Sequence, residues 1–184
     1  MKDIITIGID QSLTGTGICG IINGKMFFSA LVKSKKTEDG PMNEIKRISE
    51  IVDNILKTIE INSSLEIDLV AIEGISYMSK NTTSLSQLSG LSYMIRAELF
   101  KRGLKFVVVA PSSLKKFATG MGNAKKDLMM METYKEWGVA ITNDNICDSF
   151  CLGMLANYIC DTPKKLSKHR KEVINLIEKQ YEKK

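Results

Sequence analysis

The sequence is poor in the residues that build metal clusters and disulfide frameworks. It contains a single histidine, His169, and four cysteines that form no C-x-x-C pair. A zinc site and a disulfide scaffold are therefore not expected in this chain of 184 residues. These absences favour a reducing compartment, the cytoplasm, as the place where the protein works.

Long hydrophobic runs are also absent. No apolar stretch approaches the roughly 20 residues that cross a bilayer, and the chain enters an apolar strand almost at once, so neither a membrane span nor a signal peptide is expected. Hydrophobic residues make up 43% of the sequence, which is ordinary for a globular protein. The length predicts one domain over residues 1–162, followed by a basic helical extension over 163–184.

The opening stretch, residues 4–10, organises the rest of the chain. Its sequence, Ile-Ile-Thr-Ile-Gly-Ile-Asp, is typical of a strand buried on both faces, and it ends in Asp10. A carboxylate at the end of a core strand is costly to desolvate without a cation beside it. Asp10 either caps the following turn or holds a metal ion or a phosphate partner, with the glycine-rich residues 12–17 admitting a substrate backbone.

Hydrophobic periodicity predicts the order of the remaining elements. Apolar runs at 18–22 and 26–32 flank Asn23-Gly24, a strong hairpin signal, so the first three strands form an antiparallel meander. Helical spacing follows over residues 43–60 and 85–99, and further strands are expected at 68–73 and 105–110. The buried face of the first helix is predicted to contain Ile45, Ile48, Ile51, Val52, Ile55 and Ile59.

Two more acidic residues, Glu73 and Asp148, are candidates to lie near Asp10 in a metal-binding or phosphate-binding site. The strand at 68–73 ends in Glu73, as the first strand ends in Asp10, so both acids are expected at one edge of the sheet, unless Glu73 is only a solvated strand end. Asp148 lies early in a late helix and shares a face with Asp144 and Asn145 if that helix begins at Asp144. The simpler role for Asp144 is the helix N-cap.

Lysines gather in two places. Four of them flank the turn at Gly120 and Gly122, where they suit a phosphate backbone or form a solvated charged face: Lys115, Lys116, Lys125 and Lys126. The tail from residue 163 is predicted to be a basic amphipathic helix that contacts nucleic acid or covers the sheet. Small residues in the helix over 85–99 suggest either packing on the sheet or a self-association surface.

The acids, their spacing and the lysine segment together resemble the ribonuclease H-like superfamily, and within it the RuvC family of Holliday junction resolvases. The resemblance implies an α/β fold, ribonuclease H-like, with a five-stranded mixed sheet flanked by α-helices. It is carried by four segments: Ile7-Gly8-Ile9-Asp10 with Thr14-Gly15-Thr16-Gly17, Ala71-Ile72-Glu73, Ala110-Pro111-Ser112 through Lys115-Lys116 to Gly120-Met121-Gly122-Asn123-Ala124-Lys125-Lys126, and Asp148 with Ser149 to Ala156.

The resemblance implies a Mg²⁺-dependent endonuclease, with Mn²⁺ as a substitute, that nicks branched DNA as a homodimer. Four-way junctions are the main expected substrate, with three-way and flap DNA as further ones. Two ions about 4 Å apart would clamp the attacking and leaving oxygens. The implied catalytic and metal-binding residues are Asp10, Glu73, Asp148 and Asn145, with Asp144 as a further metal ligand. The implied DNA-binding residues are Tyr77, Lys80 and the four lysines at 115, 116, 125 and 126.

Asn145 departs from the family pattern, which usually has Asp or His at this position, three residues before the last acid. An amide oxygen can coordinate Mg²⁺, but it brings no charge. A junction-binding protein with weak or no cleavage activity therefore stays an alternative. An actin-like phosphotransferase is a weaker alternative: Gly-Ile-Asp followed by Thr-Gly-Thr-Gly also resembles its phosphate-binding hairpin, but that class needs a second such lobe, for which 184 residues leave no room. A bacterial virus or its host is the expected source.

Overall fold

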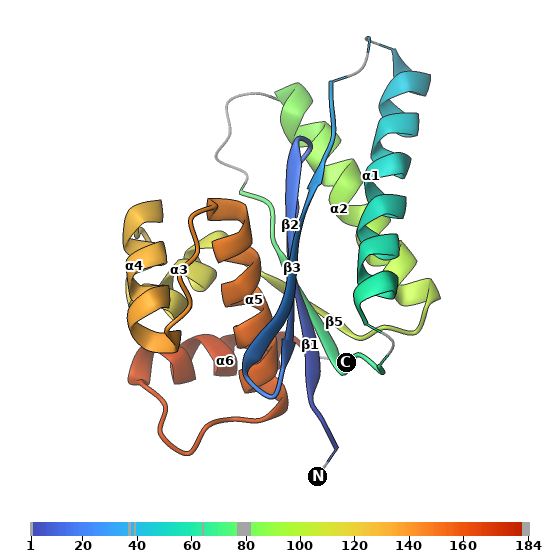
Figure 1. Ribbon diagram of the computed structural model, residues 1–184. Coiled ribbons are helices and arrows are strands. Elements are labelled where there is room, and N and C mark those ends of the chain that lie inside the picture. Colours follow the sequence, from blue (N-terminus) through green and yellow to red (C-terminus); the bar gives the residue numbers. More distant parts are fainter. Residues whose placement is uncertain (1, 37, 39, 64, 77–81, 182–184) are drawn as a thin grey trace.

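The computed structural model describes residues 2–36, 38, 40–63, 65–76 and 82–181. A five-stranded sheet lies between two layers of helices (Figure 1). Along the chain the elements are β1 (Ile5–Asp10), β2 (Gly15–Ile22), β3 (Lys25–Lys33), α1 (Pro41–Asn62), β4 (Leu69–Glu73), α2 (Thr82–Lys101), β5 (Phe106–Val109), α3 (Pro111–Thr119), α4 (Lys126–Trp137), α5 (Asp144–Cys160) and α6 (Lys168–Tyr181).

The sheet is mixed, in the order β3-β2-β1-β4-β5. The first three strands pair antiparallel, as predicted, while β4 is parallel to both β1 and β5. Asn23 (φ 50°) and Gly24 (φ 76°) both have positive φ, which is what a two-residue hairpin turn requires. The parallel pairing brings the carboxyl ends of β1 and β4 to one edge of the sheet.

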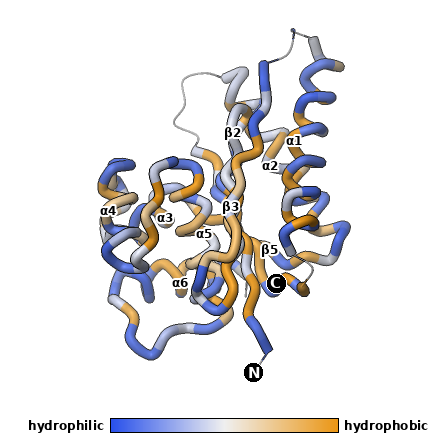
Figure 2. Tube along the Cα trace, viewed as in Figure 1, coloured by the Kyte–Doolittle hydropathy of each residue, from blue (hydrophilic) through white to orange (hydrophobic). Residues whose placement is uncertain are grey.

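Strand alternation gives β1 two different faces. Ile7 and Ile9 join the hydrophobic cluster under α1 and α2. Thr6 and Gly8 face the opposite way, toward α5, and the Thr6 hydroxyl donates a hydrogen bond of 2.9 Å to the Gly153 carbonyl. Figure 2 shows hydrophobic residues along the strands and hydrophilic ones on the outer side of α1. Both faces of the sheet are therefore covered, as a partly parallel sheet requires.

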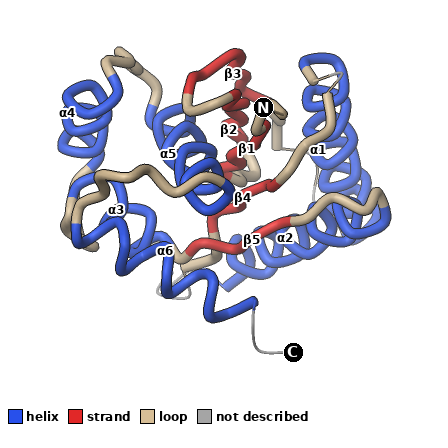
Figure 3. Tube along the Cα trace, turned by 90° about the horizontal axis from the view of Figure 1, so that it is seen from below, coloured by secondary structure: helices blue, strands red, loops and turns tan. Residues whose placement is uncertain are grey.

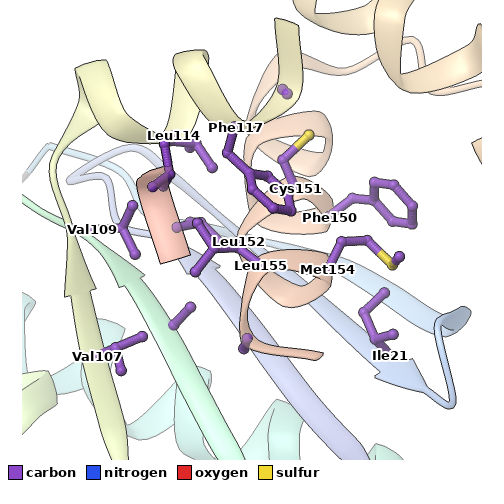
Figure 4. Packing of buried hydrophobic residues seen from close by; sticks show 14 of the residues in the cluster. Ile21, Val107, Val109, Leu114, Phe117, Phe150, Cys151, Leu152, Met154 and Leu155 are labelled. Atoms are coloured by element: carbon purple, nitrogen blue, oxygen red, sulfur yellow. The ribbon is translucent and has the colours of Figure 1, made fainter. Parts of the chain in front are cut away.

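The second hydrophobic cluster lies between the sheet and the layer of α3, α4, α5 and α6 (Figures 3 and 4). Its centre is α5, which is buried from Ser149 to Asn157. Three residues of α6 also belong to this cluster: Val173, Ile174 and Ile177. The tail helix thus covers the core, one of its two predicted roles, while a domain boundary at residue 162 stays a prediction.

Several local expectations need correction. Ile45 is 55% exposed, although its spacing predicted burial, because it lies near the first turn of α1 and beyond the edge of the sheet cluster. Pro111 does more than end a strand: it is the first residue of α3, where its fixed φ suits a helix start. Within the described ranges, no helix is both long and apolar enough to cross a membrane.

Candidate active site

Asp10 and Glu73 meet at the carboxyl edge of the sheet. β1 and β4 are parallel neighbours with Ile9 opposite Ile72, so the next residues, Asp10 and Glu73, end adjacent strands. By alternation both side chains lie on the α5 face, since Gly8 and Ala71 are on that face. The two strands therefore hold the two carboxyl groups beside each other.

The carboxyl groups of Asp10 and Glu73 interact through a side-chain hydrogen bond. Asp10 is only 6% exposed. Burial, followed by the negative charges of Glu73 and Asp148, raises the pKa of Asp10 to about 9. Burial and the charge of Asp148 raise the pKa of Glu73 to about 7, while the hydrogen bond from Asp10 opposes that rise. Without a cation, the ionised forms of these buried carboxyl groups are therefore unfavourable.

Asp148 approaches the pair from α5. Burial raises its pKa to about 6, against the opposing positive charges of Lys126 and Lys115. It acts on both Asp10 and Glu73 through its charge. Carboxyl groups from β1, β4 and α5, distant in sequence, thus interact in one place.

Glycines let α5 come this close to the sheet. A Cβ added at Gly8 would lie 1.9 Å from the Ser149 carbonyl oxygen, and one at Gly17 would lie 2.1 Å from that of Asn145. The sequence suggested that the glycines after Asp10 admit a substrate backbone. At Gly17 the backbone they admit is that of α5 itself.

The start of α5 differs from the expectation for Asp144. The N-cap is Asn143, whose side chain accepts a hydrogen bond of 3.1 Å from the Ile146 amide. Asp144 is the first helical residue, and its carboxylate forms an ion pair with Lys126. The hydrogen bond lowers the pKa of Asp144 and raises that of Lys126. Asn143 is the N-cap because its backbone is extended, as this position requires, whereas Asp144 is already helical.

Asn145 is tied to β2 at the margin of the site. Its side-chain nitrogen donates a hydrogen bond of 2.7 Å to the Gly15 carbonyl. The side chain can therefore coordinate a cation only through its amide oxygen. Coordination by Asn145 and by Asp144 stays a prediction.

The four predicted lysines have different surroundings. Lys115 on α3 and Lys126 on α4 act on the carboxyl groups through their charge. Lys116 instead donates a hydrogen bond of 2.8 Å to Glu172 of α6. Lys125 is exposed immediately before α4. Tyr77 and Lys80, also predicted to bind DNA, lie outside the described residues.

Gln11 is a positioning residue that sequence reasoning missed. It is 7% exposed, and its side-chain nitrogen donates to the Glu73 carbonyl (2.7 Å) and to the Ser92 hydroxyl (3.0 Å). It thereby ties the ends of β1 and β4 to α2. Its position directly after Asp10 could have identified it, because strand alternation turns its side chain to the face of the sheet opposite that of Asp10.

The donors around Asp10 have the chemistry of a hard-cation site. Carboxylate oxygens are the ligands that Mg²⁺ and Mn²⁺ prefer. Burial raises the pKa of all three acids, and neighbouring negative charges add to this rise at Asp10 and Glu73; a divalent cation would favour their ionised forms. In the part of the chain that is described, no three His, Cys, Asp or Glu side chains are arranged to hold a metal ion as they stand.

The mixed sheet, its helical layers and the acids at the ends of β1 and β4 define a ribonuclease H-like α/β protein. Two of the solved structures that are similar to this chain illustrate the fold. RuvC of Thermus thermophilus in complex with a Holliday junction substrate matches with a TM-score of 0.68 and 16% identity, covering 82% of this chain and 91% of its own. The yeast mitochondrial Holliday junction resolvase matches with a TM-score of 0.58 and 12% identity, covering 96% and 83%.

The family follows from the sequence itself. The family model described as crossover junction endodeoxyribonuclease RuvC matches residues 6–154, well over half of the chain. The chain belongs to the RuvC family, as the sequence motifs predicted. Among curated proteins, none matches it significantly. The matched range contains all three interacting acids and both lysines beside them, and it ends before α6.

Proposed function

We propose that this protein is a structure-selective endonuclease that nicks branched DNA, chiefly four-way junctions, by metal-assisted hydrolysis of a phosphodiester. The observation that carries the proposal is the hydrogen-bonded pair Asp10–Glu73 with the charge of Asp148 acting on both, in a chain of the RuvC family. The donors of this arrangement are the oxygen ligands that hard cations prefer.

Asp10, Glu73 and Asp148 would hold the cation, which we propose to be Mg²⁺, with Mn²⁺ as a substitute. When bound, the metal supplies Lewis acidity and a water nucleophile at neutral pH. The protein's own contribution is to place the three carboxylates on two strands and one helix, which limits how far they would move when the cation binds. Lys115 and Lys126 place positive charge at the rim, where a phosphate would enter.

We also propose that the protein acts as a homodimer, with α2 as the contact surface. Tyr93 (65% exposed) and Phe100 (78% exposed) lie seven residues apart and therefore on one face of the helix. The guanidinium of Arg96 lies 4.1 Å from the centre of the Tyr93 ring. Two copies would present one site to each of two opposed strands. Sedimentation velocity tests this: a monomer at all micromolar concentrations would contradict it.

A labelled synthetic four-way junction tests the main proposal. With Mg²⁺ we expect nicks near the crossover, and with EDTA we expect binding without nicks, because the carboxylates alone supply neither a Lewis acid nor an activated water. Linear duplex of the same sequence is the control and should stay intact. A shifted but uncut junction in Mg²⁺ would instead indicate a junction-binding protein. ATP hydrolysis without DNA binding would indicate the phosphotransferase alternative.

The place of action follows from the same proposal. A junction endonuclease needs access to DNA, so we propose the cytoplasm of a bacterial or phage-infected cell. Cell fractionation tests this, and exclusive recovery outside the cytoplasm would contradict it.

A further inference from the structure

The helix α6 lies beyond the residues that the family model matches, yet it packs against the segment that bears the lysines. We propose that Arg170 of α6 is a positioning residue for DNA binding, because it locks α3 to α4 and so fixes the lysines on either side of the turn between them. This inference rests on the proposed function, since it assigns those lysines to a DNA backbone.

Arg170 is buried although it is charged. It is 6% exposed, within a tail whose sequence predicts a basic amphipathic helix. A buried cation is unfavourable unless its hydrogen-bonding groups find partners. Its partners come from both α3 and α4. We refer to Arg170 with Phe117, Glu136 and Trp137 as the Arg170 bridge.

The first half of the bridge reaches α3. The Arg170 Nε atom donates a hydrogen bond of 3.1 Å to the Phe117 carbonyl. Phe117 lies in the last turn of α3, where carbonyl groups have no partner within the helix. A guanidinium at this end also complements the negative end of the helix dipole. The contact therefore fixes the end of α3 from which the turn departs.

The second half reaches α4. An Arg170 terminal nitrogen forms an ion pair with Glu136, and the guanidinium carbon lies 4.8 Å from the centre of the Trp137 ring. Glu136 and Trp137 are the last residues of α4. A planar guanidinium can make these contacts at once, whereas a lysine ammonium cannot.

Neighbours of Arg170 reinforce the same junction. His169 lies beside Gly120, the left-handed C-cap of α3, with its Nδ1 atom 3.5 Å from where a Cβ would be. Glu172 accepts the hydrogen bond from Lys116. Three residues within about one turn of α6 thus contact α3 or the residue that ends it. The lysines nearest the acids, Lys115 and Lys126, lie on the two helices that this junction joins.

The test compares Arg170→Lys with Ile177→Ala. Both variants weaken the packing of α6, but Ile177 is buried away from the bridge, in the region of β5 and α5 near Phe106. We expect Arg170→Lys to lower junction affinity about tenfold at moderate salt. The slope of log K against log[salt] should fall by about 1 for each phosphate that the protein no longer neutralises. Ile177→Ala should keep the wild-type slope even where its melting temperature falls equally.

A second readout needs no DNA. Hydrogen exchange at the Gly120 and Ala124 amides should accelerate in Arg170→Lys and stay unchanged in Ile177→Ala. If Arg170→Lys does not fold, Glu136→Gln decides, because Glu136 is 43% exposed and its replacement breaks only the α4 half of the bridge. Unchanged exchange or an unchanged salt slope in the bridge variants would overturn the inference. Faster exchange in a protein whose wild type binds no junction would leave the bridge in place and refute the proposed function.

Discussion

Replacing Asp10 with asparagine is expected to abolish cleavage and, in EDTA, to make the protein more stable than the wild type at pH 8. An asparagine keeps the shape of Asp10 and can still donate a hydrogen bond to Glu73, but it cannot supply a carboxylate to a cation. We expect the cleavage rate to fall by about 10³-fold or more, in line with the loss of a preorganised electrostatic group.

The stability change follows from the raised pKa of Asp10, which is about 9 in the folded protein against an ordinary value of 3.8. As the pH rises between these values, the unfolded chain loses the proton first, so the folded state of the metal-free wild type loses stability through this window and is least stable above pH 9. The variant lacks this loss. The difference of about 4 units between pH 8 and the ordinary pKa of 3.8 sets an upper limit of about 6 kcal/mol on its gain, and we expect a rise of several degrees in melting temperature.

Thermal melts in EDTA at pH 5 and pH 8 measure the effect. The wild type should melt lower at pH 8 than at pH 5, and the variant should show a smaller difference. Asp53→Asn, which changes an exposed acid on α1, is the matched control and should behave as the wild type does. A wild type that is more stable at pH 8 in EDTA, or a variant that still cuts, would contradict the assignment of Asp10.

Replacing Gly8 with alanine is expected to disrupt the fold. The added Cβ would lie 1.9 Å from the Ser149 carbonyl oxygen and 2.4 Å from the Gly153 amide nitrogen, and neither backbone atom can move without moving α5. We expect a loss of more than about 3 kcal/mol, at the upper end for overpacking. Because Asp148 precedes Ser149, any folded fraction would hold its carboxyl group farther from Asp10.

Chemical denaturation measures the loss, and Gly90→Ala is the control. At Gly90 in α2 the nearest atom to an added Cβ is the Ile48 Cδ1, at 3.6 Å, an ordinary contact. Alanine there should stabilise the helix by up to about 1 kcal/mol. Wild-type stability in Gly8→Ala would mean that α5 does not contact β1 through this glycine.

The spacing of hydrophobic residues and the residues that end each strand were enough to predict much of the fold. The alternation and length of the apolar runs predicted each strand of the sheet to within a few residues, and Asn23-Gly24 identified the hairpin. The expectation that Asp10 and Glu73 share one edge needed only that their strands be parallel, which β1 and β4 are. Asp148 was selected from its place early in a late helix, and family resemblance then joined it to Asp10 and Glu73.

Contacts between elements distant along the chain could not be predicted from the sequence in the same way. The glycines after Asp10 were expected to admit a substrate backbone, because a sequence does not say which backbone will approach them. Arg170 was not singled out within the predicted basic amphipathic helix, because burial of a single arginine depends on carbonyl and ring partners from α3 and α4. Gln11 was missed for the same reason: its partners come from β4 and α2.

The contact of α5 with β1 also bears on how the chain reaches its folded state. The hydrogen bond from Thr6 to Gly153 spans 147 positions along the chain. Proteins dominated by such distant pairings fold slowly, because a large loop must close before the contact can form. During synthesis, the first hairpin leaves the ribosome with one apolar side uncovered until α5 follows it. This face of the sheet is therefore completed only after α5, which ends at Cys160, has been synthesised.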